Sequence, residues 1–299
     1  MSAHGRSEAL VPQRAASSAQ GGPMRAQELS VVLTGASGGI GAALAAALAQ
    51  AGARLLLVGR RGAPLAALAA SLDGARNERV QALAADITTA AGRATIRDIA
   101  AARGCNALIN NAALPCFGPF ADADAAQVDA VLQTNLVAPI QLTLALLPQL
   151  RAQRRSRVLN IGSATGRLGV PGFAVYGAGK FGLRGFSETL RRELADTSVR
   201  VQYLAPRATR TGFNDERADD FNRRTRTAVD APEAVAAEAV KLLLSGRAEK
   251  FLGFPESIAV RLNSLAPRLL DRAFAPHRAA LASAARAAIH PPTTESPHA

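Results

Sequence analysis

Short apolar runs alternate with longer alanine-rich segments along most of the chain. A short continuous apolar run is typical of a strand that is buried on both faces of a parallel sheet, and the alanine-rich segments are long enough to form helices. The predicted strands cover residues 30–33, 54–58, 79–83, 107–109, 157–161 and 199–204. The predicted helices cover residues 42–51, 64–72, 90–102, 125–154 and 174–195.

This alternation predicts an α/β protein with a doubly wound parallel sheet, a Rossmann fold, as a single domain over residues 29–254. Right-handed crossovers bring the carboxyl ends of the strands to one edge, where a ligand is expected. Near the end of the domain, Asp230 is a candidate cap for a helix that runs to about residue 244, and residues 251–254 are a candidate edge strand.

The segment 207–229 departs from the pattern. It mixes arginines with acidic residues and lacks an apolar stripe. Two interpretations remain open, a mobile lid over the ligand and a solvated connecting helix.

The two ends of the chain differ from the domain. Residues 1–28 are predicted to be a disordered leader without a signal-peptide core, and residues 291–299 a disordered tail. Residues 255–290 are predicted to be a helical extension with arginines among its apolar residues. Peripheral membrane contact is one interpretation, but packing on the domain or on a second subunit is favoured, because Pro267 and Pro276 interrupt the helices.

Composition narrows the classes of function. The net charge is +12, but the arginines are spread along the chain and only 4% of residues are aromatic, so no nucleic-acid partner is expected. No run of about 18 apolar residues predicts a membrane span. Cys105 and Cys116 have no metal-ligand spacing with histidine, so no metal is expected, and they indicate a reducing, cytoplasmic compartment.

A glycine-rich turn follows the first predicted strand and opens the first helix, with the sequence Thr34-Gly35-Ala36-Ser37-Gly38-Gly39-Ile40-Gly41. Glycines let backbone N–H groups approach a phosphate closely, and the positive end of the following helix favours its charge. The turn predicts a dinucleotide site, although three glycines alone also fit a tight connection.

A candidate catalytic set follows the fifth strand. Ser163 lies just past that strand, and Tyr176 and Lys180 are four residues apart on one face of the next helix. A nearby ammonium group is expected to lower the pKa of the tyrosine from about 10, which makes it a usable acid and base. The serine hydroxyl is then placed to donate to a substrate carbonyl oxygen.

Taken together, these motifs resemble the short-chain dehydrogenase/reductase family. The resemblance runs from about residue 30 to 254 and also includes Asp86 after the third strand, Asn110-Asn111-Ala112 after the fourth and Asn135 in the long helix. It implies an NAD(P)-dependent oxidoreductase that transfers a hydride between the nicotinamide and a carbonyl or alcohol carbon. The implied catalytic tetrad is Asn135, Ser163, Tyr176 and Lys180, with Asn135 anchoring a water relay.

The resemblance also implies which residues hold the cofactor. They are Gly35, Ser37, Gly38, Gly39, Ile40, Gly41, Arg60, Asp86, Ile87, Asn111, Ala112, Tyr176, Lys180, Pro206 and Thr211. Arginine at the end of the second strand accommodates the 2′-phosphate of NADP, where an acidic residue would bind the 2′-hydroxyl of NAD. Arg60, with Ser37 as a second contact, therefore predicts NADP(H).

Three positions depart from the family pattern. Ala113 and Arg207 stand where glycine is usual, and Gly179 replaces a common serine before Lys180. None removes a catalytic group, but the charged Arg207 leaves the local loop geometry open.

The apolar loop at 168–173 predicts a small apolar or lipid-like carbonyl or alcohol substrate, such as a ketone or a 3-oxoacyl thioester. A homo-oligomer is expected from the family. The alternative function is an NADP(H)-binding regulatory or scaffolding protein with little turnover, and the intact tetrad favours the enzyme.

Overall fold

The computed structural model describes residues 22–73, 79–253, 262–263 and 266–289. Its centre is a parallel sheet in the order β3-β2-β1-β4-β5-β6-β7. The strands are β1 (Ser30–Thr34), β2 (Arg54–Gly59), β3 (Val80–Ala84), β4 (Ala107–Asn110), β5 (Ser156–Ile161), β6 (Val199–Ala205) and β7 (Glu249–Phe251). The strand order reverses between β1 and β4, so the predicted doubly wound sheet is confirmed.

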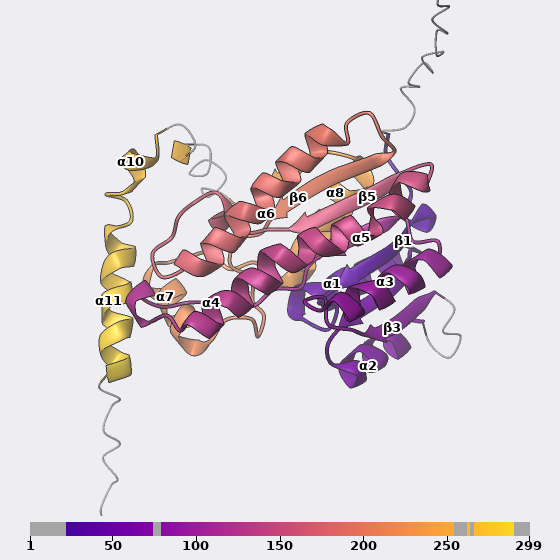
Figure 1. Cartoon of the computed structure of the whole chain (residues 1–299). Coiled ribbons are helices and arrows are strands. Elements are labelled where there is room, and N and C mark those ends of the chain that lie inside the picture. Colours follow the sequence, from indigo (N-terminus) through magenta and orange to yellow (C-terminus); the bar gives the residue numbers. More distant parts are fainter. Residues whose placement is uncertain (1–21, 74–78, 254–261, 264–265, 290–299) are drawn as a thin grey trace, which may run out of the picture.

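Helices cover both faces of the sheet (Figure 1). On one face lie α1 (Gly39–Gln50), α2 (Gly62–Asp73) and α8 (Pro232–Ser245), and on the other α3 (Ala90–Ala102), α5 (Ala138–Ala152) and α6 (Ala174–Glu193). Alternate side chains of each strand enter the two cores, because successive residues of a strand point to opposite faces. Val31 and Leu33 pack in one core and Val32 packs in the other.

The domain begins earlier than residue 29. The Met24 side chain is buried and its amide donates to Leu244 O at 2.9 Å. Arg157, which is fully buried, donates to Gly22 O at 2.8 Å, and Arg155 donates to Pro23 O at 2.9 Å. Residues 22–28 therefore belong to the domain and not to the predicted leader; residues 1–21 lie outside the described residues.

The long helix predicted at 125–154 is interrupted. It consists of α4 (Ala125–Leu132), a π-helical turn (Gln133–Val137) and α5. By length and composition alone the stretch Ala125–Ala152 could cross a membrane. Leu142, Leu146 and Leu150 are buried in the core of the domain, however, whereas Leu144 is exposed. The buried leucines make α5 a core helix of the domain.

The segment 207–229 forms a short helix, α7 (Glu216–Arg224), capped by Asp215, which accepts from the Ala218 amide at 2.8 Å. Ala218 and Phe221 are buried, so the helix has an apolar face that its charged residues conceal in the sequence. The sequence interpretation that this segment lacks such a face was wrong.

The candidate cap Asp230 is also corrected. The N-cap of α8 is Ala231, and the Asp230 carboxylate instead accepts from Arg207 Nε and Nη2. The final strand, β7, is shorter and earlier than the predicted 251–254, and residue 254 lies outside the described residues.

The C-terminal extension packs on the domain. It contains α10 (Pro267–Leu270) and α11 (Ala275–Ile289), and α11 lies beside α7 (Figure 1). His277 of α11 contacts the Phe221 ring, and Ala280 is buried. Of the two interpretations of this extension, the structure agrees with packing. The predicted tail at 291–299 lies outside the described residues.

Candidate active site

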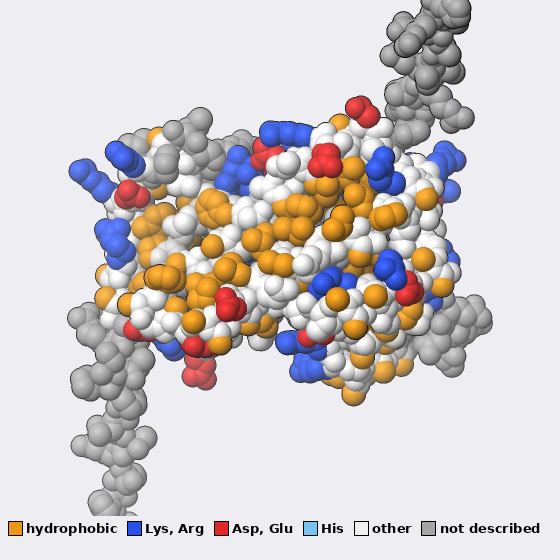
Figure 2. Space-filling view, viewed as in Figure 1, with side chains coloured by type: hydrophobic (Ala, Val, Ile, Leu, Met, Phe, Trp, Pro, Cys, Tyr) orange, Lys and Arg blue, Asp and Glu red, His pale blue; other side chains and the backbone are white. Residues whose placement is uncertain are grey.

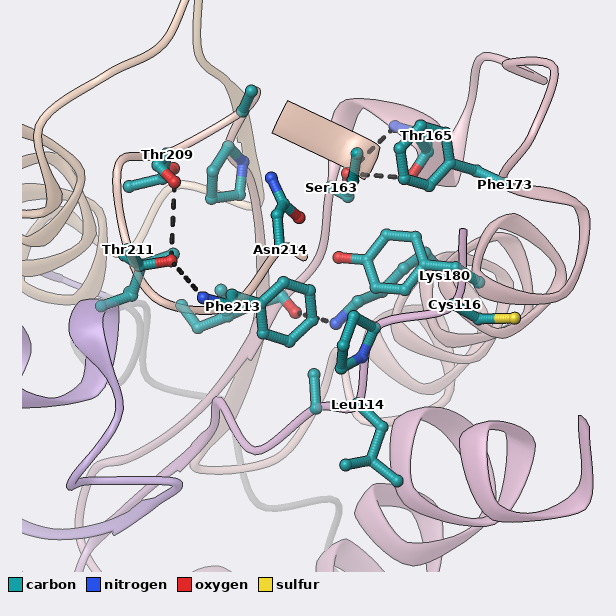
Figure 3. Close-up of a pocket in the computed structure, with 18 of the residues that line it drawn as sticks. Leu114, Cys116, Ser163, Thr165, Phe173, Lys180, Thr209, Thr211, Phe213 and Asn214 are labelled. Atoms are coloured by element: carbon teal, nitrogen blue, oxygen red, sulfur yellow. Dashed lines mark hydrogen bonds between the residues drawn. The ribbon is translucent and has the colours of Figure 1, made fainter. Parts of the chain in front are cut away.

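A cleft of about 1120 Å³ lies at the carboxyl ends of the strands. The glycine turn after β1, the loops after β4 and β5, and the start of α6 all line it. The segment 207–229 and the C-terminal extension line it as well, and Figure 3 shows the part around Lys180. The topology therefore brings the predicted cofactor residues and three of the four predicted catalytic residues, Ser163, Tyr176 and Lys180, into one cavity.

The glycine turn is built against the loop after β4. Gly35 has φ of 64°, and a Cβ there would come 2.7 Å from Ala112 Cα. Asn111 Nδ2 donates to Thr34 O and to Gly35 O, both at 3.1 Å. A Cβ on Gly41 would overlap Gly35 O. The turn needs its glycines, and with the N-terminus of α1 behind it, it fits the phosphates of a dinucleotide.

The end of β2 carries positive charge. Arg60 is exposed and lines the cleft together with Ser37. Partial burial raises the pKa of Asp86, but hydrogen bonds from Thr88 and the charge of Arg60 hold it below its usual value. Asp86 is therefore ionised at neutral pH, and Ile87 beside it also lines the cleft.

Ser163, Tyr176 and Lys180 meet in the cleft. Ser163 Oγ accepts from Thr165 N at 3.2 Å and from Thr165 Oγ1 at 2.8 Å. Lys180 Nζ donates to Ile161 O at 3.0 Å and lies 5.7 Å from the centre of the Tyr176 ring. The two side chains therefore share one face of α6, as their spacing predicted.

The electrostatics of this set differ from the sequence expectation. Burial raises the pKa of Tyr176 to about 12, partly offset by its hydrogen bond with Ser163. Burial lowers the pKa of Lys180 to about 8. The expected lowering of the tyrosine pKa by the lysine is absent here, because desolvation disfavours both charged forms and the Lys180 ammonium is bonded to a backbone carbonyl.

Asn135 is not in the cleft wall. Its side chain is fully buried in the π-helical turn, where Oδ1 accepts from Leu114 N at 2.7 Å and Nδ2 donates to Leu114 O at 2.9 Å. Asn135 thus fixes the loop after β4. A Cβ on Gly179 would lie 3.3 Å from Asn135 Cβ, which accounts for glycine at this position.

The loop after β6 closes over the glycine turn. Pro206 and Thr211 line the cleft, and the Thr211 side chain lies where a Cβ on Gly39 would be. Arg207, the residue that left this loop uncertain, donates to both carboxylate oxygens of Asp230, at 2.8–3.1 Å. This ion pair joins Arg207, the first residue of the segment 207–229, to Asp230, the residue directly after the segment.

Ala113, the third position that departs from the family pattern, lines the cleft. Among the described non-glycine residues only Arg226 has a positive φ, so the backbone at Ala113 does not need glycine. No group of three or more His, Cys, Asp or Glu side chains that could hold a metal occurs within the described ranges.

Aromatic side chains form the substrate side of the cleft. Five of the chain's ten phenylalanines line it: Phe117, Phe173, Phe213, Phe221 and Phe274. The Tyr176 ring lies 6.3 Å from Phe173 and 6.0 Å from Phe213 between ring centres, so these rings surround the candidate acid. Sequence reasoning identified only Phe173 of this set, because the others lie on three separate segments: the loop after β4, the segment 207–229 and the C-terminal extension.

The fold and the site together identify the class of protein. Residues 30–222 match the short chain dehydrogenase family, and the chain belongs to that family of nicotinamide-dependent oxidoreductases.

Individual proteins similar to this chain support the family assignment. Nodulation protein G of Rhizobium sp. (strain N33) is 34% identical over 69% of this chain and 86% of its own. Ketoacyl reductase HetN of Nostoc sp. (strain PCC 7120) is 29% identical over 82% of this chain and 88% of its own. A solved metagenomic short-chain oxidoreductase in complex with NADP is 32% identical, with a TM-score of 0.63 over 75% of this chain and 96% of that one.

Proposed function

We propose that this protein is an NADP(H)-dependent reductase of an apolar carbonyl compound. The observation that carries the proposal is the meeting of Ser163, Tyr176 and Lys180 in one cleft with the glycine turn and an aromatic wall. The family supplies the general reaction class, and the residues of the cleft support the finer assignment.

The chain's own groups can handle the oxygen and the proton. The bound cofactor supplies the hydride. Ser163 Oγ, held by Thr165, is the donor for the carbonyl oxygen, and Tyr176 is the proton donor. Burial raises the pKa of Tyr176 to about 12, so the phenol carries its proton at neutral pH and can donate it. Lys180 is the cation beside Tyr176, and its ammonium group is proposed to bind the cofactor ribose.

The choice of NADP(H) rests on Arg60. An arginine at the end of β2 suits a 2′-phosphate, and no acidic residue stands at that strand end, where Gly59, Arg60 and Arg61 follow Val58. The metagenomic oxidoreductase was solved with NADP, which agrees with this choice.

The substrate is proposed to be apolar or lipid-like. Leu168 and Val170 join the phenylalanines along the cleft. A ketone or a 3-oxoacyl thioester fits these apolar residues, and the relative HetN is by its name a ketoacyl reductase.

We also propose that the protein is a homo-oligomer in the cytoplasm. Figure 2 shows a band of hydrophobic side chains across the face that α5 and α6 form. Leu144 of α5 and Phe181 of α6 are exposed large hydrophobic residues. An exposed apolar band of this kind marks an interaction surface, and a second copy of the chain is the proposed partner. No nucleic-acid partner is proposed.

The test is a screen of NADPH oxidation with ketones, aldehydes and 3-oxoacyl thioesters. We expect turnover with apolar ketones or thioesters, and loss of turnover with unchanged NADPH affinity in Tyr176→Phe. Phe186→Leu, a change in the core far from the cleft lining, is the matched control. NADPH binding without oxidation of any compound would refute the reductase and favour the regulatory binding protein.

A further inference from the structure

The C-terminal extension supplies the far wall of the cleft. Leu270, Ala273, Phe274 and His277 line the cavity, and all four lie beyond residue 222, where the match to the family ends. The neighbouring Leu281 packs against the loop at Gly172, where a Cβ would lie 3.1 Å from Leu281 Cδ1. The wall therefore lies outside the part of the chain that the family match covers.

His277 is the polar residue in this wall. Its ring lies edge-on to Phe221 at 5.7 Å and to Phe274 at 5.0 Å between ring centres. Nδ1 is enclosed by the protein without a hydrogen-bond partner among the residues described, so a ligand in the cleft can reach only Nε2. Burial lowers the pKa of His277, so the imidazole is neutral at neutral pH and Nε2 can pair with one hydroxyl group, as donor or acceptor according to the tautomer.

The position of His277 fixes which part of a ligand it meets. Phe173 lies 6.3 Å from Tyr176, Phe221 lies 6.0 Å from Phe173, and His277 lies 5.7 Å from Phe221, all between ring centres. Two phenylalanine rings therefore stand between the candidate proton donor and the imidazole. His277 can contact the distal end of a substrate but not its reacting carbon.

We propose that His277 is a specificity-determining residue that hydrogen-bonds a hydroxyl group at the distal end of an aromatic ketone. The inference rests on the proposed function, because Tyr176 defines the reacting end. The phenylalanine rings meet one another tilted or edge-on, and flat aromatic rings of a ligand can pack against them in the same way. A hydroxyl can pair with Nε2 of a neutral imidazole, whereas a carboxylate would find no positive charge on His277.

The test compares two probes, 4-acetyl-4′-hydroxybiphenyl and 4-acetylbiphenyl, with the NADP⁺-loaded protein. The chain has no tryptophan, so the fluorescence of the probe reports binding directly. We expect the hydroxylated probe to bind roughly fivefold more tightly, the range of one neutral hydrogen bond. In His277→Phe the preference should disappear while 4-acetylbiphenyl keeps its affinity, and His277→Asn should retain part of it.

Ala279→Ser is the matched control, since Ala279 is an exposed residue of the same helix and does not line the cleft. It should keep the full preference, and all variants should keep the melting temperature of the parent. Equal affinity of the parent for both probes, or a preference retained in His277→Phe, would overturn the inference. A preference that depends on His277 in a protein that reduces neither probe nor any other ketone would refute the reductase and leave the distal site standing.

Discussion

The ion pair between Arg207 and Asp230 should control how often the segment 207–229 opens. The pair joins the two ends of the segment, with the Arg207 Nη2 to Asp230 Oδ1 distance at 2.8 Å and both side chains 20% exposed. Backbone bonds reinforce it: the Arg210 amide donates to Asp230 O and the Asp230 amide to Ala208 O, each at 2.9 Å. The segment between carries α7, whose Phe221 lies in the wall of the cleft.

The magnitude follows from geometry and exposure. A two-point, charge-assisted pair is stronger than an exposed surface pair, which contributes about 0.2–1 kcal/mol, but partial exposure leaves it screened by solvent. We take about 1.4 kcal/mol for its loss, which corresponds to a tenfold larger population of the open segment. The backbone bonds remain, so the domain itself should stay folded.

Trypsin measures this opening, because the segment contains exposed arginines at 210, 217, 223, 224 and 226. When the open state closes faster than it is cut, the cleavage rate follows its population. Asp230→Asn should therefore raise the cleavage rate within the segment about tenfold, and high salt should reduce the difference between parent and variant.

The control is the pair of Arg97 and Asp98, whose side chains are 50% and 66% exposed. Asp98→Asn should leave cleavage of the segment unchanged. The reasoning is refuted if Asp230→Asn changes the cleavage rate by less than twofold. It is also refuted if Arg207→Ala and the double variant show additive effects in a mutant cycle, because a real pair must couple.

Three further predictions concern the cofactor, the titration and the aromatic wall. Arg60→Glu should lower NADPH affinity at least tenfold and improve NADH affinity, measured by binding titration, whereas Arg61→Glu, its neighbour, should change the ratio less. The pKa of Lys180 is lowered to about 8, so between pH 8 and 10 the unfolded state binds more protons than the native state and stability rises with pH. In denaturant titrations the unfolding free energy of the parent should rise by on the order of 2 kcal/mol over that range relative to Lys180→Met. If the difference between the two proteins does not change with pH, the pKa of Lys180 is not lowered. Phe221→Ala should destabilise the protein by about 3 kcal/mol in the same titration, since it empties a site shared by Phe117, Phe173 and His277, while Phe120→Ala, an exposed ring, should cost little.

The sheet was predictable because its strands are buried on both faces. The fourth strand was expected at 107–109 and is found at Ala107–Asn110, and the alternation gave every neighbouring helix in order. The interruption at Gln133–Val137 was not predictable, because the bonds between Asn135 and Leu114 depend on a loop distant in the sequence. Residues 22–28 were missed for a related reason. Buried Arg157 donates a hydrogen bond to Gly22 O, but in the sequence an arginine in a strand resembles a surface residue and does not indicate such a contact.

The two halves of the cleft differ in how the sequence encodes them. The cofactor half comes from contiguous motifs, such as the glycine turn, in which neighbouring residues act together. The substrate half comes from single residues on distant segments, such as Phe117, Phe221 and His277, and the charged sequence of α7 conceals Phe221. Low aromatic content argued against stacking surfaces, yet half of the phenylalanines gather in this one wall.

This difference determines what resemblance can transfer to this chain. The family match covers residues 30–222, which include the glycine turn, Tyr176 and most of α7, but it ends before α8, α10 and α11. The far wall of the cleft, with Phe274 and His277, therefore lies outside the part that the family match covers. Relatives can share the hydride chemistry without sharing the substrate, so the substrate of this protein must be sought through the aromatic wall and α11.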